Sequence, residues 1–194
     1  MSKILYLHGF NSSPESHKAR ILHEYMKSSG LGDRIIIPEI PPVPVDAIEL
    51  LQQHAEDIIK HDELSLAGSS LGGFYATWLA EKYQCPAVLI NPAVRPHELL
   101  RKYLGENINY YTDVRWVLNE THIDQFEELF IEKISKPQRY LLMLQTGDET
   151  LDYREALDKY TGCPSIVEQG GSHEFSEFER YLDKILSFCN VTED

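Results

Sequence analysis

The sequence predicts an α/β protein, a three-layer α/β/α sandwich with a mainly parallel sheet of about six strands. Short apolar runs alternate along the chain with segments in which apolar residues recur at helical spacing. The runs are almost continuously hydrophobic, which is typical of strands that helices cover on both faces. At 194 residues and 42% hydrophobic content, the chain has the size of one domain with one substantial core. We therefore expect a single domain over residues 1–194.

Six apolar runs are the expected strands, at residues 4–7, 34–38, 64–67, 87–90, 140–145 and 165–168. Ser13 before Pro14 predicts the start of the first helix, and Gly30 predicts its end. Asp46 and Glu49 have the spacing of a capping box for the second helix. The last helix is predicted from one apolar stripe, made of Phe175, Phe178, Leu182, Ile185 and Cys189.

The segment between the fourth and fifth expected strands is much longer than an ordinary connection. It covers residues 92–137 and contains two stretches of helical pattern, near residues 97–103 and 122–134. Tyr110, Tyr111 and Trp116 lie between these two stretches. We expect this segment to be a helical lid inserted within the single domain.

The composition excludes several classes of partner. There are 18 Lys and Arg against 31 Asp and Glu, a formal net charge of −13, and no basic cluster. Nucleic acids and anionic membranes are recognised through such clusters, so neither is an expected partner. The three cysteines have no C-x-x-C spacing and indicate neither a disulfide framework nor a zinc site. The apolar run at residues 4–7 is too short for a secretory signal or a spanning helix, which makes the cytoplasm the expected location.

The motif G-x-S-x-G occurs at residues 68–72, with Ser70 at its centre. An expected strand precedes the motif, and a segment of helical pattern follows it. This is the strand–turn–helix setting of a nucleophile elbow, in which a serine hydroxyl projects from the carboxyl end of a sheet. A Gly-Ser turn without catalytic function is the alternative. A dinucleotide-binding fingerprint fits worse, because the glycines do not follow G-x-G-x-x-G.

A nucleophilic serine needs a histidine base and a carboxylate that orients the histidine. His173 follows the last expected strand, which places it at the same edge of the sheet as Ser70, whereas most other histidines fall within or beside helical patterns. Asp148 follows the fifth expected strand and is the preferred acid. Asp152, as a helix cap, and Glu149, as a solvated loop residue, are the other two candidates. The order Ser70, Asp148, His173 is that of the α/β-hydrolase triad.

Acyl transfer also needs donors for an oxyanion. The backbone N–H of Leu71, directly after the expected nucleophile, is the first candidate, and the N–H of Phe10, in the loop after the first strand, is the second. Gly9 allows the backbone to pass close to the substrate. We expect His8 to anchor this loop through hydrogen bonds.

Five segments together resemble the α/β-hydrolase superfamily and, within it, the YqiA-like esterases. They are residues 6–14 (YLHGFNSSP), 68–73 (GSSLGG), 91–96 (NPAVRP), 147–149 (GDE) and 170–173 (GGSH). The resemblance implies a serine hydrolase of esterase or thioesterase type, with Ser70, Asp148 and His173 at the triad positions. It also implies a compact α/β-hydrolase fold that lacks the two antiparallel entry strands of larger members.

The expected function is hydrolysis of carboxylic esters or thioesters through an acyl-enzyme on Ser70. Short-chain acyl esters are the preferred substrates, acyl-CoA is a further candidate, and no metal or organic cofactor is expected. The alternative is a non-catalytic binding protein on a hydrolase scaffold, with the lid as its partner surface. The candidate substrate-binding residues are Asn11, Arg95, Tyr110, Tyr111 and Trp116. The patterns do not indicate an oligomeric state.

Overall fold

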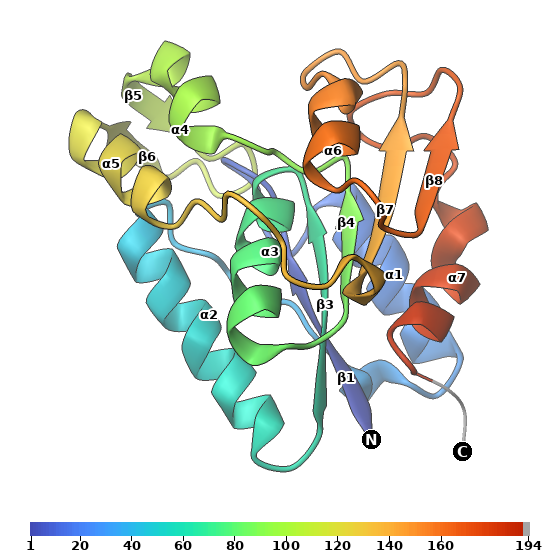
Figure 1. Cartoon of the computed structure of the whole chain (residues 1–194). Coiled ribbons are helices and arrows are strands. Elements are labelled where there is room, and N and C mark those ends of the chain that lie inside the picture. Colours follow the sequence, from blue (N-terminus) through green and yellow to red (C-terminus); the bar gives the residue numbers. More distant parts are fainter. Residues whose placement is uncertain (192–194) are drawn as a thin grey trace.

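The computed structural model describes residues 1–191, in which one parallel six-stranded sheet forms the middle layer (Figure 1). The order of strands across the sheet is β2-β1-β3-β4-β7-β8. The strands are β1 Ser2–Leu7, β2 Ile35–Ile36, β3 Glu63–Ser69, β4 Ala87–Ile90, β7 Tyr140–Gln145 and β8 Ser165–Glu168. All six expected strands are confirmed, although β2 is shorter than predicted. Because every neighbouring pair is parallel, the carboxyl ends of the strands meet at one edge.

Helices cover both faces of the sheet, which confirms the three-layer architecture. Along β1, Leu5 and Leu7 pack toward α2 (Pro44–Ile59) and α3 (Leu71–Tyr83), whereas Ile4 and Tyr6 pack toward α1 (His17–Ser28) and α7 (Leu182–Phe188). This alternation is the two-residue period of a strand that is buried on both faces. Within residues 1–191, no helix is both long and apolar enough to cross a bilayer.

Two predicted helix starts are wrong. Helix α1 begins at His17 with Ser16 as its N-cap, while the Ser13 hydroxyl accepts from the Glu15 N–H at 3.0 Å in the preceding turn. Helix α2 begins at Pro44, because proline is favoured at the first helical position, so Asp46 lies in the first turn and forms no capping box. The predicted end of α1 is confirmed: Gly30 has φ +73° directly after the cap residue.

The predicted last helix is only partly correct. All five residues of its apolar stripe are buried. They do not share one helix, however, because Phe175 adopts φ 60° in a turn and Phe178–Tyr181 forms a 3-10 helix before α7 begins. The apolar pattern therefore predicted the burial of these residues correctly, but the prediction of one continuous helix was wrong.

The long segment after β4 contains more than helices. It comprises α4 (Pro96–Leu99), a 3-10 turn, an antiparallel hairpin of β5 (Gly105–Ile108) and β6 (Arg115–Leu118), and α5 (Glu120–Glu128). The hairpin was not predicted, and α5 is shorter than the expected helix at residues 122–134. Figure 1 shows these elements together at one end of the molecule, beside the carboxyl ends of the central strands. We call residues 92–137 the insert.

Candidate active site

Ser70 lies at a sharp turn between β3 and α3. Its backbone has φ 55° and ψ −121°, a region that non-glycine residues rarely adopt. The Ser70 N–H donates to Ile90 O at 3.1 Å, and Ser70 O accepts from the Gly73 N–H at 2.9 Å. Helix α3 starts so close to β1 that a Cβ on Gly72 would lie 2.0 Å from Leu7 O. This strained, tightly packed turn presents the hydroxyl at the carboxyl edge of the sheet, as in a nucleophile elbow.

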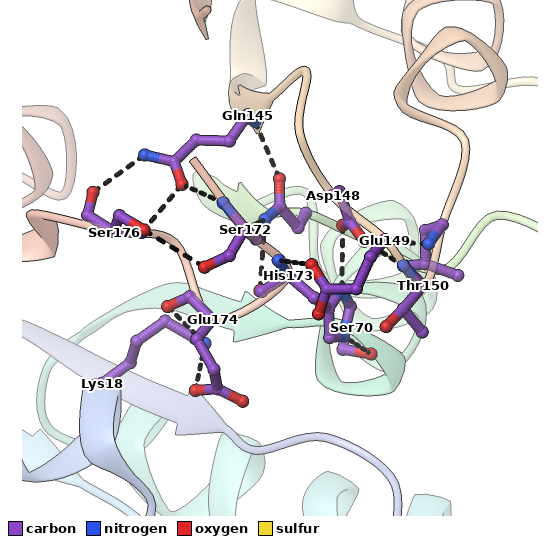
Figure 2. A network of polar contacts seen from close by, with 12 residues as sticks. Lys18, Ser70, Gln145, Asp148, Glu149, Thr150, Ser172, His173, Glu174 and Ser176 are labelled. Atoms are coloured by element: carbon purple, nitrogen blue, oxygen red, sulfur yellow. Dashed lines mark hydrogen bonds and ion pairs between the residues drawn. The ribbon is translucent and has the colours of Figure 1, made fainter. Parts of the chain in front are cut away.

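His173 joins Ser70 to Asp148 (Figure 2). Its Nε2 lies 3.1 Å from Ser70 Oγ, and its Nδ1 lies 2.8 Å from Asp148 Oδ2. A neutral imidazole with its proton on Nδ1 donates to the carboxylate and accepts from the hydroxyl, so one tautomer satisfies both contacts. The structure thus brings the three side chains, which follow β3, β7 and β8, into one hydrogen-bonded chain.

The Asp148 carboxylate is surrounded by donors. Its side chain is 2% exposed, and its Oδ1 accepts from the N–H groups of Thr150 and Leu151, both at 2.8 Å. Burial by itself raises the pKa of this carboxyl, but the hydrogen bonds from His173 and from the two amides outweigh burial and hold the pKa of Asp148 below its ordinary value. An ionised Asp148 is suited to stabilise an imidazolium.

The other two acids have different contacts. Asp152 Oδ1 accepts from the Arg154 N–H at 3.0 Å, so Asp152 caps helix α6 (Tyr153–Lys159). This is the role of a helix cap that the sequence suggested for it. Glu149 does more than face solvent, because its Oε2 accepts from the His173 N–H at 3.0 Å. Of the three acids, Asp148 is the one bonded to the imidazole.

The two amides expected to face an oxyanion both belong to segments beside Ser70. Leu71 is the first residue of α3, so the helix itself offers its N–H no acceptor. Gly9, which precedes Phe10, passes next to the nucleophile, and a Cβ on Gly9 would lie 3.3 Å from Ser70 Cβ. Within residues 1–191, neither the Leu71 N–H nor the Phe10 N–H donates to a protein acceptor. Both donors are available to a bound molecule.

His8 holds the loop that contains Phe10. Its Nδ1–H donates to Gly9 O, and its Nε2 accepts from the Ile40 N–H, both at 3.1 Å. Burial lowers the pKa of His8 to about 4, so the ring is neutral at pH 7, as the acceptor role of Nε2 requires. The hydrogen bonds expected for His8 are therefore present.

Ser70 and His173 face a cavity of about 550 Å³. The insert contributes aromatic and aliphatic side chains to its wall, namely Leu99, Leu100, Tyr103, Tyr110 and Tyr111. A second hollow, of about 380 Å³, contains Leu71 and Trp116. Residues 8–12 line both hollows, so the two hollows share this loop as part of their walls. Within residues 1–191, no group of His, Cys, Asp or Glu is arranged to hold a metal ion.

The candidate substrate-binding residues are distributed unevenly. Asn11 lines both hollows, Tyr110 and Tyr111 line the larger one, and Trp116 lines the smaller one. Arg95 lines neither hollow. Its side chain is about half exposed, and its Nε lies 3.8 Å from Glu98 Oε1. The structure therefore brings four of these five residues to the hollows beside Ser70 and leaves Arg95 outside them.

Sequence reasoning missed three buried polar residues around the His173 loop. Lys18 Nζ donates to Glu174 O at 3.0 Å and to Glu174 Oε2 at 3.2 Å, and it lines the larger cavity. Burial lowers the pKa of Lys18, although Glu174 opposes that effect. Asn91 and Gln145 each stand at the end of an apolar strand and contact the loop. The position of a polar residue at the end of a buried strand could have identified Asn91 and Gln145 from the sequence.

Comparisons with known proteins support this picture of the fold. The family model described as "Uncharacterised protein family (UPF0227)" matches residues 3–190. A UPF0227 protein of Pectobacterium carotovorum is 26% identical over 192 residues, which cover 95% of this chain and 97% of that protein. Alpha/beta hydrolase domain-containing protein 17C of Mus musculus is 27% identical over 138 residues, 68% of this chain. The match spans only 39% of the length of that relative.

Among solved structures, one described with the metagenome-derived lipolytic enzymes LipS and LipT has a TM-score of 0.70 at 17% sequence identity. The match covers 99% of this chain and 96% of that chain. At this level of identity, the likeness establishes the fold. Because the family model covers almost the whole chain, the protein belongs to the UPF0227 family, and its fold is that of the α/β-hydrolases.

Proposed function

We propose that this protein is a serine hydrolase that cleaves carboxylic esters or thioesters through an acyl-enzyme on Ser70. The observation that carries the proposal is the continuous hydrogen-bonded chain from Ser70 Oγ through His173 to Asp148, with contacts of 3.1 and 2.8 Å. A serine hydroxyl becomes an effective nucleophile when a base of this kind accepts its proton. The lipolytic enzymes described for a structure of the same fold are consistent with this reaction class.

The geometry supports a reaction in two stages. His173 Nε2 accepts the proton of Ser70 as Oγ attacks the carbonyl carbon, and the Asp148 carboxylate stabilises the resulting imidazolium. The N–H groups of Leu71 and Phe10 donate to the oxygen that becomes negative. The C–O or C–S bond to the leaving group then breaks, and the imidazolium gives its proton to the departing oxygen or sulfur, which leaves as an alcohol or thiol. Water, deprotonated by the same imidazole, attacks the acyl-enzyme; the bond to Ser70 Oγ breaks, the imidazolium returns its proton to Oγ, and the carboxylic acid is released.

The substrate proposed is a small molecule with an apolar, neutral acyl group. Aromatic and aliphatic side chains of the insert line the larger cavity, which suits an apolar substrate part. Two basic residues of the insert are paired with carboxylates: Arg95 faces Glu98, and Arg101 Nη1 lies 2.6 Å from Glu120 Oε2. Together with the net charge of −13, this arrangement favours short neutral esters over acyl-CoA.

Labelling with a fluorophosphonate probe tests the proposal. The native protein should form a covalent adduct at Ser70, and the Ser70→Ala variant should not. An unreactive native protein would instead support the alternative, a binding protein on a hydrolase scaffold that uses the insert as its partner surface. Hydrolysis of p-nitrophenyl esters and matched thioesters of increasing acyl length then measures both acyl preference and leaving-group preference.

A further inference from the structure

The loop that carries His173 depends on side chains from the sheet. Residues 169–177, between β8 and the final helices, contain no helix or strand. The backbone polar groups of such a loop lack the partners that a helix or strand provides, and they are satisfied by side chains, by other loops or by water. Side chains from β7 and from the residue after β4 supply many of these partners. Figure 2 shows the one from β7, Gln145, beside Ser172 and Ser176 of the loop. The loop that carries the imidazole is therefore held in place by side chains at the ends of the central strands.

Gln145 holds both ends of this loop. It is the last residue of β7 and is 4% exposed. Its Oε1 accepts from the Ser172 N–H at 3.0 Å and the Ser176 N–H at 2.7 Å, and its Nε2 donates to Ser176 O at 2.8 Å. Gly171 makes room for this amide: it has φ +76°, and a Cβ there would lie 2.1 Å from Gln145 Oε1. One buried side chain thus brackets His173 on both sides.

Asn91 holds the middle of the loop. It follows the last residue of β4 and is 2% exposed. Its Nδ2 donates to Ser172 O at 3.0 Å and to His173 O at 3.2 Å. Its Oδ1 accepts from the backbone N–H of Gln145 at 3.0 Å, so the Asn91 side chain bonds both to the loop and to the end of β7.

The residue before Asn91 holds the nucleophile. Ile90 O accepts from the Ser70 N–H at 3.1 Å. Adjacent residues therefore fix the backbone of Ser70 and the backbone of His173. The backbones that carry the Ser70 hydroxyl and the His173 imidazole are thus both bonded to the end of β4 and the residue that follows it.

We propose that Asn91 and Gln145 are positioning residues for His173, which act by fixing the imidazole relative to Ser70 and Asp148. This inference rests on the proposed function, because positioning matters for a reaction at Ser70. Neither amide contacts the imidazole, so each acts through the loop backbone. A misplacement of about 1 Å is enough to slow a reaction of this kind by about 100-fold.

The main test is Asn91→Asp, which keeps the shape of the side chain. One carboxylate oxygen still accepts from the Gln145 N–H, but the other now faces Ser172 O and His173 O and repels them. We expect kcat for a p-nitrophenyl ester to fall about 100-fold while KM stays within about twofold. Gln145→Met, of similar length but with no donor and only a weakly accepting sulfur, should also lower kcat.

The matched control is Ser65→Ala. Ser65 is 1% exposed and its hydroxyl donates to Cys189 O at 3.0 Å, but it lies in the half of β3 far from the active-site edge. This variant should lower the melting temperature and leave kcat unchanged. If Asn91→Asp and Gln145→Met keep kcat within about twofold, or if Ser65→Ala loses as much kcat as they do, the positioning role is wrong. Should Asn91→Asp fail to fold, Gln145→Met decides.

A second readout does not require turnover. The proton on His173 Nδ1, bonded to Asp148, should give a downfield proton NMR signal in the native protein. That signal should broaden or disappear in Asn91→Asp and Gln145→Met, with far-UV circular dichroism unchanged, and persist in Ser65→Ala. If the native protein neither labels nor hydrolyses esters, the proposed function fails. An unchanged His173 signal in both variants contradicts the positioning role independently.

Discussion

The indole Nε1 of Trp116 donates to Asn11 Oδ1 at 2.8 Å. This bond joins strand β6 of the insert to the loop that contains the proposed oxyanion donor Phe10. The Tyr110 N–H also donates to Asn11 O, at 3.2 Å. Asn11 and Trp116, expected to bind substrate, are therefore bonded to each other, and they couple the insert to the oxyanion loop.

Replacing Trp116 with Phe should test this coupling. The variant keeps a ring against Phe10, whose centroid lies 5.7 Å from that of Trp116, but loses the N–H donor. One neutral hydrogen bond is worth about 1 kcal/mol, so kcat/KM for a p-nitrophenyl ester should fall about fivefold. Trp78→Phe, on helix α3 and outside both hollows, is the control and should leave kcat/KM unchanged. Equal effects of the two substitutions would exclude the coupling.

The assignment of the acid predicts opposite results for two aspartates. Asp148→Asn should lower kcat by about 10,000-fold, because an amide cannot hold the Nδ1–H tautomer or balance an imidazolium. Asp152→Asn should keep kcat within about twofold, since asparagine also caps a helix. Steady-state kinetics on both variants decides between them, and the reverse result would move the acid to Asp152.

Gly72 is predicted to be intolerant of any side chain. In Gly72→Ala the new Cβ would lie 2.0 Å from Leu7 O, a backbone atom of a central strand that cannot move aside. We expect a loss of about 3 kcal/mol or more in the free energy of unfolding in urea. Gly32→Ala is the matched control, because its Cβ would lie 3.5 Å from Lys27 Cα, an ordinary contact. A Gly72→Ala protein as stable as Gly32→Ala would contradict the close approach of α3 to β1.

His8 should make stability depend on pH. Burial lowers its pKa from 6.5 to about 4 in the folded protein, so between these pH values the unfolded chain binds a proton that the folded protein does not. The free energy of unfolding should therefore be greatest above pH 6.5 and fall by about 3 kcal/mol through this one group as the pH drops toward 4.

Urea titrations at pH 7.5 and pH 5 measure this dependence. His8→Gln should be less stable at pH 7.5 and lose most of the difference between the two pH values. The exposed His61 provides the control, since His61→Gln should keep the difference. If His8→Gln keeps the native difference in the free energy of unfolding between the two pH values, groups other than His8 cause that difference.

Much of the fold was predictable from the chain. The apolar runs identified all six strands because burial on both faces leaves almost no polar positions in a parallel strand. The chain order of Ser70, Asp148 and His173 was informative because parallel strands bring their carboxyl ends to one edge. The hairpin of β5 and β6 was missed, since its alternating exposed residues carry little hydrophobic signal. The starts of α1 and α2 were misplaced because several residues near each start could have served as caps.

By itself, the sequence determined which strands are buried, where the nucleophile elbow lies and which three residues form the hydrogen-bonded chain. Only the tertiary structure decided what surrounds that chain. Asn91 and Gln145 contact a loop far away in sequence, and Asn11 bonds to Trp116 across 105 positions. Patterns along a sequence report periodicity and local turns, whereas the partner of a buried amide depends on which strands become neighbours in the sheet. The fold thus supplies the pairing that holds the predicted residues in place.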